Sequence, residues 1–514
     1  MNNGSGNSIV SIEDSRALDA EAQADWGFNA FALIEAAGRL CAQALAESYP
    51  ELFKKRPVIS VAVGTGNNAA DAMVMLRYYI LSSLVAADLS TVILSRKPKD
   101  GETGPWVDLL HSLEKMEVDV LVWDKGDSWD AEYIITESDI IIDGVAGTGL
   151  SGALRGTAAE MVKAINSSER PLIASVDLPS GSSDQWEPGM PIVKADLTLA
   201  IEPQKYCLYT PAARPYAGKI VPVRGVFPGE LLASYKGAEL LEWESARGKI
   251  AKIRQDAYKN ERGTVEIRAG SQGATGAAVI AGRGAQAAGA GLIRLVVDDG
   301  IYPIVASRAS SGIMVVPSGF TVEGASPPDA VLLGPGWGRA QSRAREFEMA
   351  LALEKGGAPL VLDAEAIGLA KGAVFNRNAI MTPHPGEFSR LSGLDKDELL
   401  CRPAPALLDY SHKCNAVIVF KGHVITIAAP DGRLGVVDGM LPGLASGGSG
   451  DLLAGITVGI AAGMARRGCF DAYACAAVAA ALLIASGKCL KTRFTDPLEI
   501  SCKAADLAGE AWLL

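Results

Sequence analysis

The sequence lacks three features that would place it quickly in a class of protein. It has no excess of positive charge, because 48 lysine and arginine residues stand against 59 aspartate and glutamate residues, for a net charge of -11. General nucleic-acid-binding proteins carry a basic stripe, so this balance argues against nucleic acid as a partner. No Cys-x-x-Cys pair occurs, and no cysteine–histidine cluster has the spacing of a zinc site.

Signals for export or membrane insertion are also missing. No basic stretch followed by an apolar one stands near residue 1, so we expect no secretory signal. The uncharged stretch 472–487 is shorter than the roughly 20 residues that span a bilayer, and it is typical of a buried helix. The eight cysteines are scattered, and we expect buried free thiols. The sequence predicts a cytoplasmic protein that acts on small molecules, with no membrane partner.

What the sequence has is a regular alternation of apolar, β-branched runs with longer helix-like segments. Continuous apolar strands separated by helices are typical of parallel sheets covered on both faces. The segment 230–249 differs, with mixed charges and no Gly-rich turn, and we predict that it links an α/β domain at 8–229 to a second at 250–514. Strands are predicted at 58–63, 90–95, 118–123, 138–142, 172–176, 264–268, 292–297, 329–333, 359–362, 378–382 and 416–420.

The strongest motif of the first half is the sequence Gly-Thr-Gly-Asn-Asn-Ala-Ala-Asp at 64–71, between a predicted strand and a predicted helix. Its Gly-x-Gly-x-x-Ala core fits the dinucleotide fingerprint, in which glycines permit a tight turn and the helix N-terminus offers N–H groups to a phosphate. The next strand ends in Ser95-Arg96-Lys97, without the acid that would bind a ribose hydroxyl. Ordinary NAD-dependent hydride transfer is therefore disfavoured, and a purely structural turn is the alternative.

Two further predicted strands of the first half end in a carboxylate. Asp143 precedes a second Gly-rich loop, Gly147-Thr148-Gly149, and Asp177 precedes Leu178-Pro179-Ser180. Ligands of open α/β sheets bind at this edge. Oxygen atoms from several strand ends would suit a hard monovalent cation or ribose hydroxyls, whereas lone aspartates at strand ends are often only helix caps.

Together these motifs resemble the NAD(P)H-hydrate epimerase domain, over about residues 10–230. The resemblance implies a potassium ion near Asn68, Asp143 and Ser180, and catalytic roles for Asp177 and Lys205. It also implies a hydrate-binding pocket formed by Asn67, Asn68, Ala69, Ala70, Asp71, Gly147, Thr148, Gly149, Leu150, Ser151, Gly152, Ala153 and Asp177.

The chain departs from this family at three positions. The family usually has Asn-Asn-Gly-Gly-Asp-Gly, where this chain has alanine at 69, 70 and 72. If one of these positions needs a positive φ, or lets a phosphate approach the backbone, a Cβ costs on the order of 1 kcal/mol or blocks the approach. The sequence therefore predicts a folded first domain that is either an epimerase, with activity impaired or intact, or a non-catalytic nucleotide-binding or oligomerisation module.

The strongest motif of the whole chain is Gly447-Gly448-Ser449-Gly450-Asp451, which opens a long apolar helix. The N–H groups of such a loop form an anion hole, and the helix dipole assists it. A carboxylate in the first turn can take a proton from a hydroxyl that attacks a phosphoryl group. The alternative is a Gly-rich turn with a capping aspartate. A Walker phosphate loop is absent.

Other residues of the second half follow predicted strands of the same domain. Gly336 lies in a Gly-rich loop, Asp363 ends a strand, and His384 stands between two prolines. Lys421 begins a cationic turn that suits a nucleotide phosphate. Each of these is more often structural than functional when found alone, but they all lie at the carboxyl ends of strands.

This set resembles the ribokinase-like superfamily and, within it, the ADP-dependent NAD(P)H-hydrate dehydratase, over roughly residues 250–500. The Thr-Pro-His-Pro-Gly-Glu-Phe sequence at 382–388 is specific to this branch. The resemblance implies that Asp451 is the catalytic base and that Mg²⁺ accompanies ADP. It implies nucleotide binding by Lys421, Gly422, His423, Val424, Ile425, Gly447, Gly448, Ser449 and Gly450, and hydrate binding by Ala277, Gly336, His384 and Asp451.

The function that these resemblances imply is metabolite repair. Hydrated NAD(P)H in the (6S) form would be dehydrated to NAD(P)H with release of AMP and phosphate, and the first domain would interconvert the two epimers. The sequence does not decide whether ADP or ATP is the phosphoryl donor, or whether NADH hydrate or NADPH hydrate is the preferred substrate. We expect the protein to form a homo-oligomer. The alternative is a kinase of a small vitamin precursor or sugar, whose first domain is non-catalytic.

Overall fold

The structure, a computed structural model, describes residues 8–123, 128–250, 252–254, 256–320, 326–338, 343–490 and 494–513. The chain divides into two compact units, Met1–Ala238 and Glu239–Leu514. The division falls inside the segment 230–249, which is itself folded. It contains part of helix α8 (Gly229–Ser234), strand β10 (Ala238–Leu240) and helix α9 (Trp243–Ala246).

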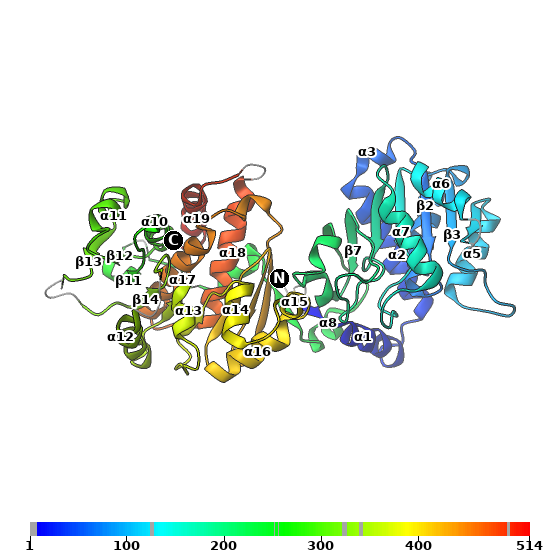
Figure 1. Ribbon diagram of the computed structural model, residues 1–514. Helices are drawn as coiled ribbons and strands as arrows, with labels where there is room; N and C mark the ends of the chain where they lie inside the picture. The colour runs from blue at the N-terminus through cyan, green and yellow to red at the C-terminus, as the bar shows by residue number, and fades with distance from the viewer. Residues whose placement is uncertain are drawn as a thin grey trace. The chain divides into compact units, whose positions relative to one another are not determined.

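A seven-stranded parallel sheet forms the centre of unit 1, with the strand order β4-β3-β2-β5-β6-β7-β9 (Figure 1). The two strands at one end, β7 and β9, were not predicted; β9 contains a proline and is largely half-exposed, so its apolar pattern is weak. The strands are β2 (Ile59–Val63), β3 (Ser90–Leu94), β4 (Asp119–Val122), β5 (Ile140–Gly144), β6 (Leu172–Val176), β7 (Leu197–Ile201) and β9 (Lys219–Val223), and a separate parallel pair joins β1 (Ser8–Val10) to β8 (Gln204–Lys205).

Helices cover both faces of this sheet, because successive strand residues point to opposite sides. Val61 and Val63 pack with α1, α2, α4 and α5, whereas Ala62 packs with α6 and α7. Unit 1 is therefore the three-layer αβα arrangement that the sequence predicts. Its helices are α1 (Ile12–Ala24), α2 (Ala30–Ser48), α3 (Pro50–Phe53), α4 (Asn67–Leu81), α5 (Pro105–Lys115), α6 (Trp129–Glu137), α7 (Gly156–Ser167) and α8.

The loops after β2 and β5 meet because the chain leaves these neighbouring strands toward opposite sides of the sheet. Such a switch point opens a crevice at the carboxyl edge. Gly64 allows the approach: a Cβ there would lie 2.2 Å from the carbonyl oxygen of Val145. The helix that follows, α4, begins at Asn67 with no side-chain cap.

Unit 2 is built on a mixed sheet with the order β13-β12-β11-β14-β15-β16-β17-β18-β19-β10. The predicted strands β11, β12 and β14 to β17 are parallel, as expected, and β13, which was not predicted, also pairs parallel with β12; β18 pairs antiparallel with both β17 and β19. Loops of three and five residues connect these last strands, too short for a parallel crossover. The strands are β11 (Thr264–Arg268), β12 (Leu292–Val297), β13 (Met314–Pro317), β14 (Ala330–Leu333), β15 (Leu360–Leu362), β16 (Ala379–Met381), β17 (Val417–Phe420), β18 (Val424–Ala428) and β19 (Leu434–Asp438).

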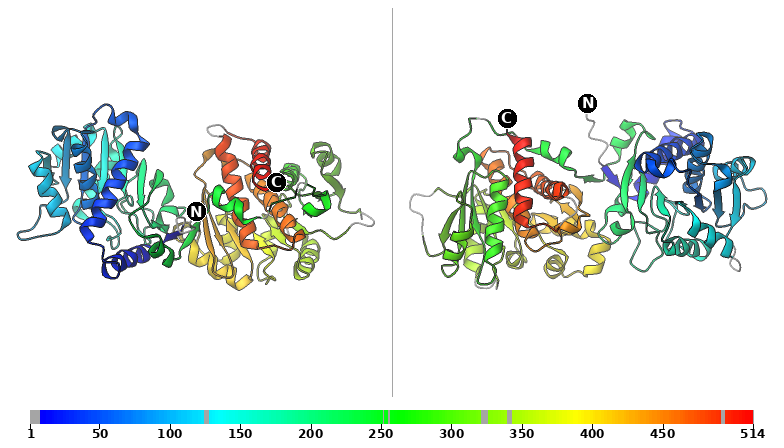
Figure 2. Two further views of the ribbon diagram at one scale, coloured as in Figure 1. Left: turned by 180° about the vertical axis from the view of Figure 1, so that it is seen from behind. Right: turned by 90° about the horizontal axis from the view of Figure 1, so that it is seen from above.

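Two layers of helices also cover the sheet of unit 2 (Figure 2). One core contains α10, α17, α18 and α19; the other contains residues of α12, α13, α14 and α16. The three-layer αβα arrangement predicted for this unit is thus confirmed. The helices are α10 (Thr275–Ala287), α11 (Tyr302–Arg308), α12 (Ala344–Lys355), α13 (Glu365–Leu369), α14 (Pro385–Ser392), α15 (Lys396–Cys401), α16 (Pro403–Cys414), α17 (Ser449–Arg466), α18 (Ala472–Leu490) and α19 (Pro497–Trp512).

Small residues let the helices of the first core approach closely. A Cβ at Gly455 of α17 would lie 2.1 Å from the carbonyl oxygen of Ala281 in α10. The neighbouring helix α18 is the one described helix long and apolar enough to cross a membrane, but most of it is buried in this core, as expected for a core helix. The last helix, α19, is tied to the first residues of the unit, because Ile253 donates a hydrogen bond to the carbonyl oxygen of Trp512 at 2.6 Å.

We predict that Gly455→Ala destabilises unit 2, because the added methyl group meets backbone and cannot be accommodated without moving α10. Overpacking of this kind costs about 1–3 kcal/mol. Gly509→Ala in α19 is the matched control: its Cβ would meet only the Leu513 side chain at 3.8 Å, and alanine favours a helix. Thermal unfolding should show a lower midpoint for the first variant only. Equal midpoints would contradict the close packing.

Candidate functional site

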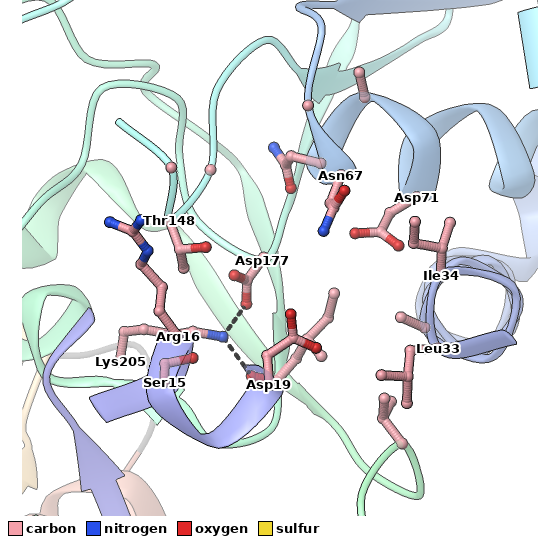
Figure 3. Close-up of a pocket in the computed structure, with 18 of the residues that line it drawn as sticks. Ser15, Arg16, Asp19, Leu33, Ile34, Asn67, Asp71, Thr148, Asp177 and Lys205 are labelled. Carbon is pink, nitrogen blue, oxygen red and sulfur yellow. Dashed lines mark hydrogen bonds and ion pairs between the residues drawn. The ribbon is translucent and has the colours of Figure 1, made fainter. Parts of the chain in front are cut away.

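A cavity of about 560 Å³ lies in unit 1 at the carboxyl edge of β2, β5 and β6 (Figure 3). Most of the predicted hydrate-binding residues line it, but Ala70, Ser151, Gly152 and Ala153 do not. The lining residues that were predicted are Asn67, Asn68, Ala69, Asp71, Gly147, Thr148, Gly149, Leu150, Asp177 and Lys205. Residues that the sequence did not indicate include Ser15, Arg16 and Asp19 of α1, and Leu33 and Ile34 of α2.

A buried ion pair lies in this cavity. Lys205 Nζ lies 2.6 Å from Asp177 Oδ1 and donates a second hydrogen bond to the carbonyl oxygen of Ile201 at 3.0 Å. Asp177 follows β6 with a φ of +62°, a left-handed conformation that residues other than glycine rarely adopt. Strained backbone of this kind clusters at functional sites. The structure thus brings the two predicted catalytic residues of unit 1 together.

A second carboxylate, Asp71, faces the same cavity without a cationic partner (Figure 3). Burial raises the pKa of Asp71 well above its ordinary value, and the negative charge of Asp177 raises it further. Asp71 Oδ1 and Asn68 Nδ2 are buried and have no hydrogen-bond partner among the described residues. Buried polar atoms without partners are rare in folded proteins, and here they face a cavity, so they are available to a ligand.

The three residues implied for potassium, Asn68, Asp143 and Ser180, lie around one buried carboxylate. Asp143 is fully buried and accepts hydrogen bonds only from uncharged donors: Ser175 Oγ at 2.7 Å, Ser180 N at 2.9 Å, Ser180 Oγ, and Val145 N at 3.3 Å. Burial raises the pKa of this carboxyl despite these bonds.

Ser180 and Asn68 both lie beside the loop that follows β5. Ser180 Oγ accepts from Ala146 N at 2.8 Å, and a Cβ at Gly147 would lie 3.0 Å from the Cβ of Asn68. A buried carboxylate with no cationic side chain, near serine and amide oxygens, suits a hard monovalent cation. The residues therefore fit the group.

The site of unit 2 is organised by the start of α17. Gly448, which precedes the helix, has a φ of +94° and provides no side-chain cap, so the first N–H groups of α17 are available to an anion. Asp451 lies in the first turn. The pKa of Asp451 is raised to about 7, mainly by burial and then by the Asp363 carboxylate, although the Lys421 ammonium lowers it.

A second buried ion pair stands beside this helix start. Lys421 Nζ lies 2.5 Å from Asp363 Oδ1, which also accepts from Thr382 Oγ1 at 2.7 Å. Burial lowers the pKa of Lys421, but the charges of Asp363 and Glu387 outweigh this effect and raise it. A Cβ at Gly450 would lie 3.3 Å from Lys421 Nζ, so the ammonium group reaches the Gly-rich loop.

The other predicted residues of unit 2 that are described below do not share one setting. Ala277 and Gly336 are adjacent, since a Cβ at Gly336 would lie 2.7 Å from the Cβ of Ala277. His384 caps α14: its Nδ1 accepts from Gly386 N at 3.0 Å and from Glu387 N at 3.3 Å. Val424 and Ile425 are buried in β18, so only their backbone is available to a nucleotide.

Comparison with known proteins identifies the family. Residues 30–207 match the family described as YjeF-related protein N-terminus, and residues 265–505 match the one described as NAD(P)H-hydrate dehydratase. The bifunctional NAD(P)H-hydrate repair enzyme Nnr of Gloeobacter violaceus is 33% identical over 450 residues, which cover 83% of each chain. The chain belongs to the family of bifunctional NAD(P)H-hydrate repair enzymes.

The chain is also similar to two further proteins. Nnr of Escherichia coli is 28% identical over 464 residues, which cover 86% of this chain and 83% of the relative. A solved structure of the ADP/ATP-dependent NAD(P)H-hydrate dehydratase from Bacillus subtilis, co-crystallized with ATP/Mg²⁺, is 26% identical, with a TM-score of 0.46; the match covers 53% of this chain and 98% of that one. Unit 1 thus contains the epimerase domain of the repair enzyme and unit 2 the dehydratase domain.

The three alanines of the epimerase domain lie inside helix α4, and none has a positive φ. The concern that they strain the backbone is therefore wrong. Ala72 packs against Gly144, where a Cβ would lie 2.6 Å from that of Ala72, and only Ala69 lines the cavity. Alanine stabilises a helix relative to glycine.

We predict that the triple variant Ala69→Gly, Ala70→Gly, Ala72→Gly is less stable, by about 1 kcal/mol per site, because glycine is a poor helix former. It should gain no epimerase activity. The matched control is Ala158→Gly, Ala159→Gly, Ala164→Gly in α7, away from the cavity. Denaturant unfolding and epimer interconversion measure the two effects, and faster interconversion in the first variant would show that the alanines obstruct the site.

We predict that kcat/KM of the dehydratase domain rises with pH through about 7, because Asp451 accepts a proton only when ionised. Lys421→Met should move this midpoint to higher pH, since it removes a charge that favours the carboxylate. Asp363→Asn should move it to lower pH. Initial rates between pH 5 and 9 measure the profile, and a midpoint that stays fixed in both variants would exclude Asp451 as the titrating group.

Proposed function

We propose that both domains of this chain are active and that they act in sequence on hydrated NAD(P)H. The epimerase domain interconverts the R and S hydrates, and the dehydratase domain consumes the S form. The observation that carries the proposal is similar in each domain: a carboxylate, buried for Asp177 and half-buried for Asp451, at a site bordered by a helix start that has no side-chain cap.

In the epimerase domain, Asp177 takes the proton of the C6 hydroxyl, and Lys205 holds this carboxylate in position. The oxygen then forms a carbonyl at C6 as the C6–N1 bond breaks and leaves its electron pair on N1. N1 re-forms the bond on the opposite face of this carbonyl, and Asp177 returns the proton to the oxygen. Asp71 and Asn68 supply unpartnered polar atoms for the hydrate. A potassium ion held by Asn68, Asp143 and Ser180 would balance the buried charge of Asp143 and fix the loop beside it.

In the dehydratase domain, Asp451 takes the proton of the C6 hydroxyl. The hydroxyl oxygen attacks the terminal phosphoryl group of ADP at the same time, and AMP leaves. Elimination of phosphate from C6, with loss of a proton from C5, restores the double bond of NAD(P)H. The first N–H groups of α17 and the Lys421 ammonium hold the transferring phosphate, so the protein acts mainly by positioning and charge stabilisation. Mg²⁺, which would arrive with the nucleotide, would neutralise the charge of its phosphates.

The eight cysteines are free, but only five are buried; Cys469, Cys489 and Cys502 are exposed, which corrects the prediction that all are buried. Exposed free thiols are compatible with a reducing compartment. We propose a cytoplasmic enzyme on this basis, and we retain the homo-oligomer as a prediction.

The turnover of an equilibrated mixture of both NADH hydrate epimers tests the proposal. We predict that the full chain, with ADP, Mg²⁺ and K⁺, converts the whole mixture to NADH faster than the epimers interconvert alone, followed by absorbance. Conversion that stops at the share of one epimer would contradict an active epimerase. A stable phosphorylated product would favour the kinase alternative, and turnover with ATP only would correct the donor.

A further inference from the structure

One wall of the epimerase cavity comes from α1, a helix that lies before the matched family segment 30–207. The five lining residues of α1 share one face of the helix, because they recur at intervals of three to four residues. They are Ser15, Arg16, Asp19, Ala20 and Gln23. Nothing in the motifs of the sequence pointed to this wall.

The two cationic side chains that line the cavity differ in whether they have an ion-pair partner. Lys205 is neutralised by Asp177 at 2.6 Å. Arg16, the other cationic residue among those that line the cavity, has no ion pair and no side-chain hydrogen bond with any residue that the structure describes. An unpaired guanidinium at the wall of a cavity is free to bind an anion, and its planar set of donors matches a phosphate.

Two acidic residues of the cavity, Glu202 and Asp19, are hydrogen-bonded to groups other than Arg16. Glu202 accepts hydrogen bonds from the backbone N–H groups of Gly225 at 2.6 Å and Val226 at 2.7 Å. Asp19, three residues after Arg16 on the same helix, accepts from Gln23 Nε2 at 3.1 Å. The charge of Arg16 is therefore not cancelled by a bonded carboxylate.

Arg16 lies in a different part of the cavity wall from the ion pair of Asp177 and Lys205. Figure 3 shows its side chain running from α1 toward Thr148, on the Gly-rich loop after β5, whereas Asp177 and Lys205 lie deeper. The uncapped start of α4 borders the same cavity through Gly66 and Asn67. Backbone N–H groups and a guanidinium thus face one space.

We propose that Arg16 binds a phosphate group of the dinucleotide hydrate and thereby sets the affinity of the epimerase domain for its substrate. The inference rests on the proposed function of that domain. Because Arg16 is remote from the reacting ring, its contact is the same in the ground state and in the transition state, and its loss should raise KM and leave kcat unchanged.

The test uses the full chain with Asp451→Asn, which keeps the hydrate from being dehydrated, and follows interconversion of a purified epimer by chromatography. Arg16→Ala should raise KM about tenfold, the effect of losing one charge-assisted hydrogen bond. Arg16→Lys should recover part of this loss. Arg170→Ala, an exposed arginine paired with Glu137 on the surface of the same unit, is the control and should leave KM unchanged.

Two substrates identify the phosphate. An equal rise in KM for NADH hydrate and NADPH hydrate indicates the diphosphate, and a rise for NADPH hydrate alone indicates the 2′-phosphate. Unchanged KM for both in Arg16→Ala, or a fall in kcat with KM constant, overturns the inference. If the parent chain does not interconvert the epimers, the proposed function fails; calorimetric binding of the hydrate to both chains then tests Arg16, and equal affinities overturn it.

Discussion

A buried lysine–aspartate ion pair organises each of the two sites: Lys205 with Asp177 in unit 1, and Lys421 with Asp363 in unit 2. Removing two charges from water is costly, and close pairing with further hydrogen bonds offsets the cost. In each pair, the lysine is already bound to its own aspartate. The neighbouring acid, Asp71 or Asp451, is then left in a low-dielectric site without a bonded cation, and its proton is held more tightly.

Two aspartate side chains of one site can therefore lie in different environments, although both are carboxyl groups. In unit 2, Asp363 accepts from Lys421 and Thr382, whereas Asp451 stands in the first turn of a helix and titrates near neutrality. Environments that separate the proton affinities of two carboxyl groups are the usual means by which one fold assigns them different roles. Here the lysine is paired with Asp363, and Asp451 is left without an ion pair of its own.

The sequence was informative where chemistry and backbone geometry are encoded together in a few consecutive residues. The Gly-rich turns at 64–66 and 447–450, and the carboxylates at the ends of β5 and β6, could be placed because glycine and strand ends have local signatures. The antiparallel strands β18 and β19 were missed although the short loops between them carried the signal. The wall formed by α1 could not be found, because an arginine on an amphipathic helix looks the same whether it faces solvent or a cavity.

The tie between α19 and the start of unit 2 bears on how this unit is made. The core that α10 forms with α17 and α19 joins segments far apart in the chain, and such contacts form late, after a long loop has closed. The ribosome delivers α19 after every strand of the sheet, so the apolar α18 lacks this cover until α19 has been synthesised. The core of this unit therefore closes only once α19 is available, and chains truncated before α19 would expose the surfaces that aggregate.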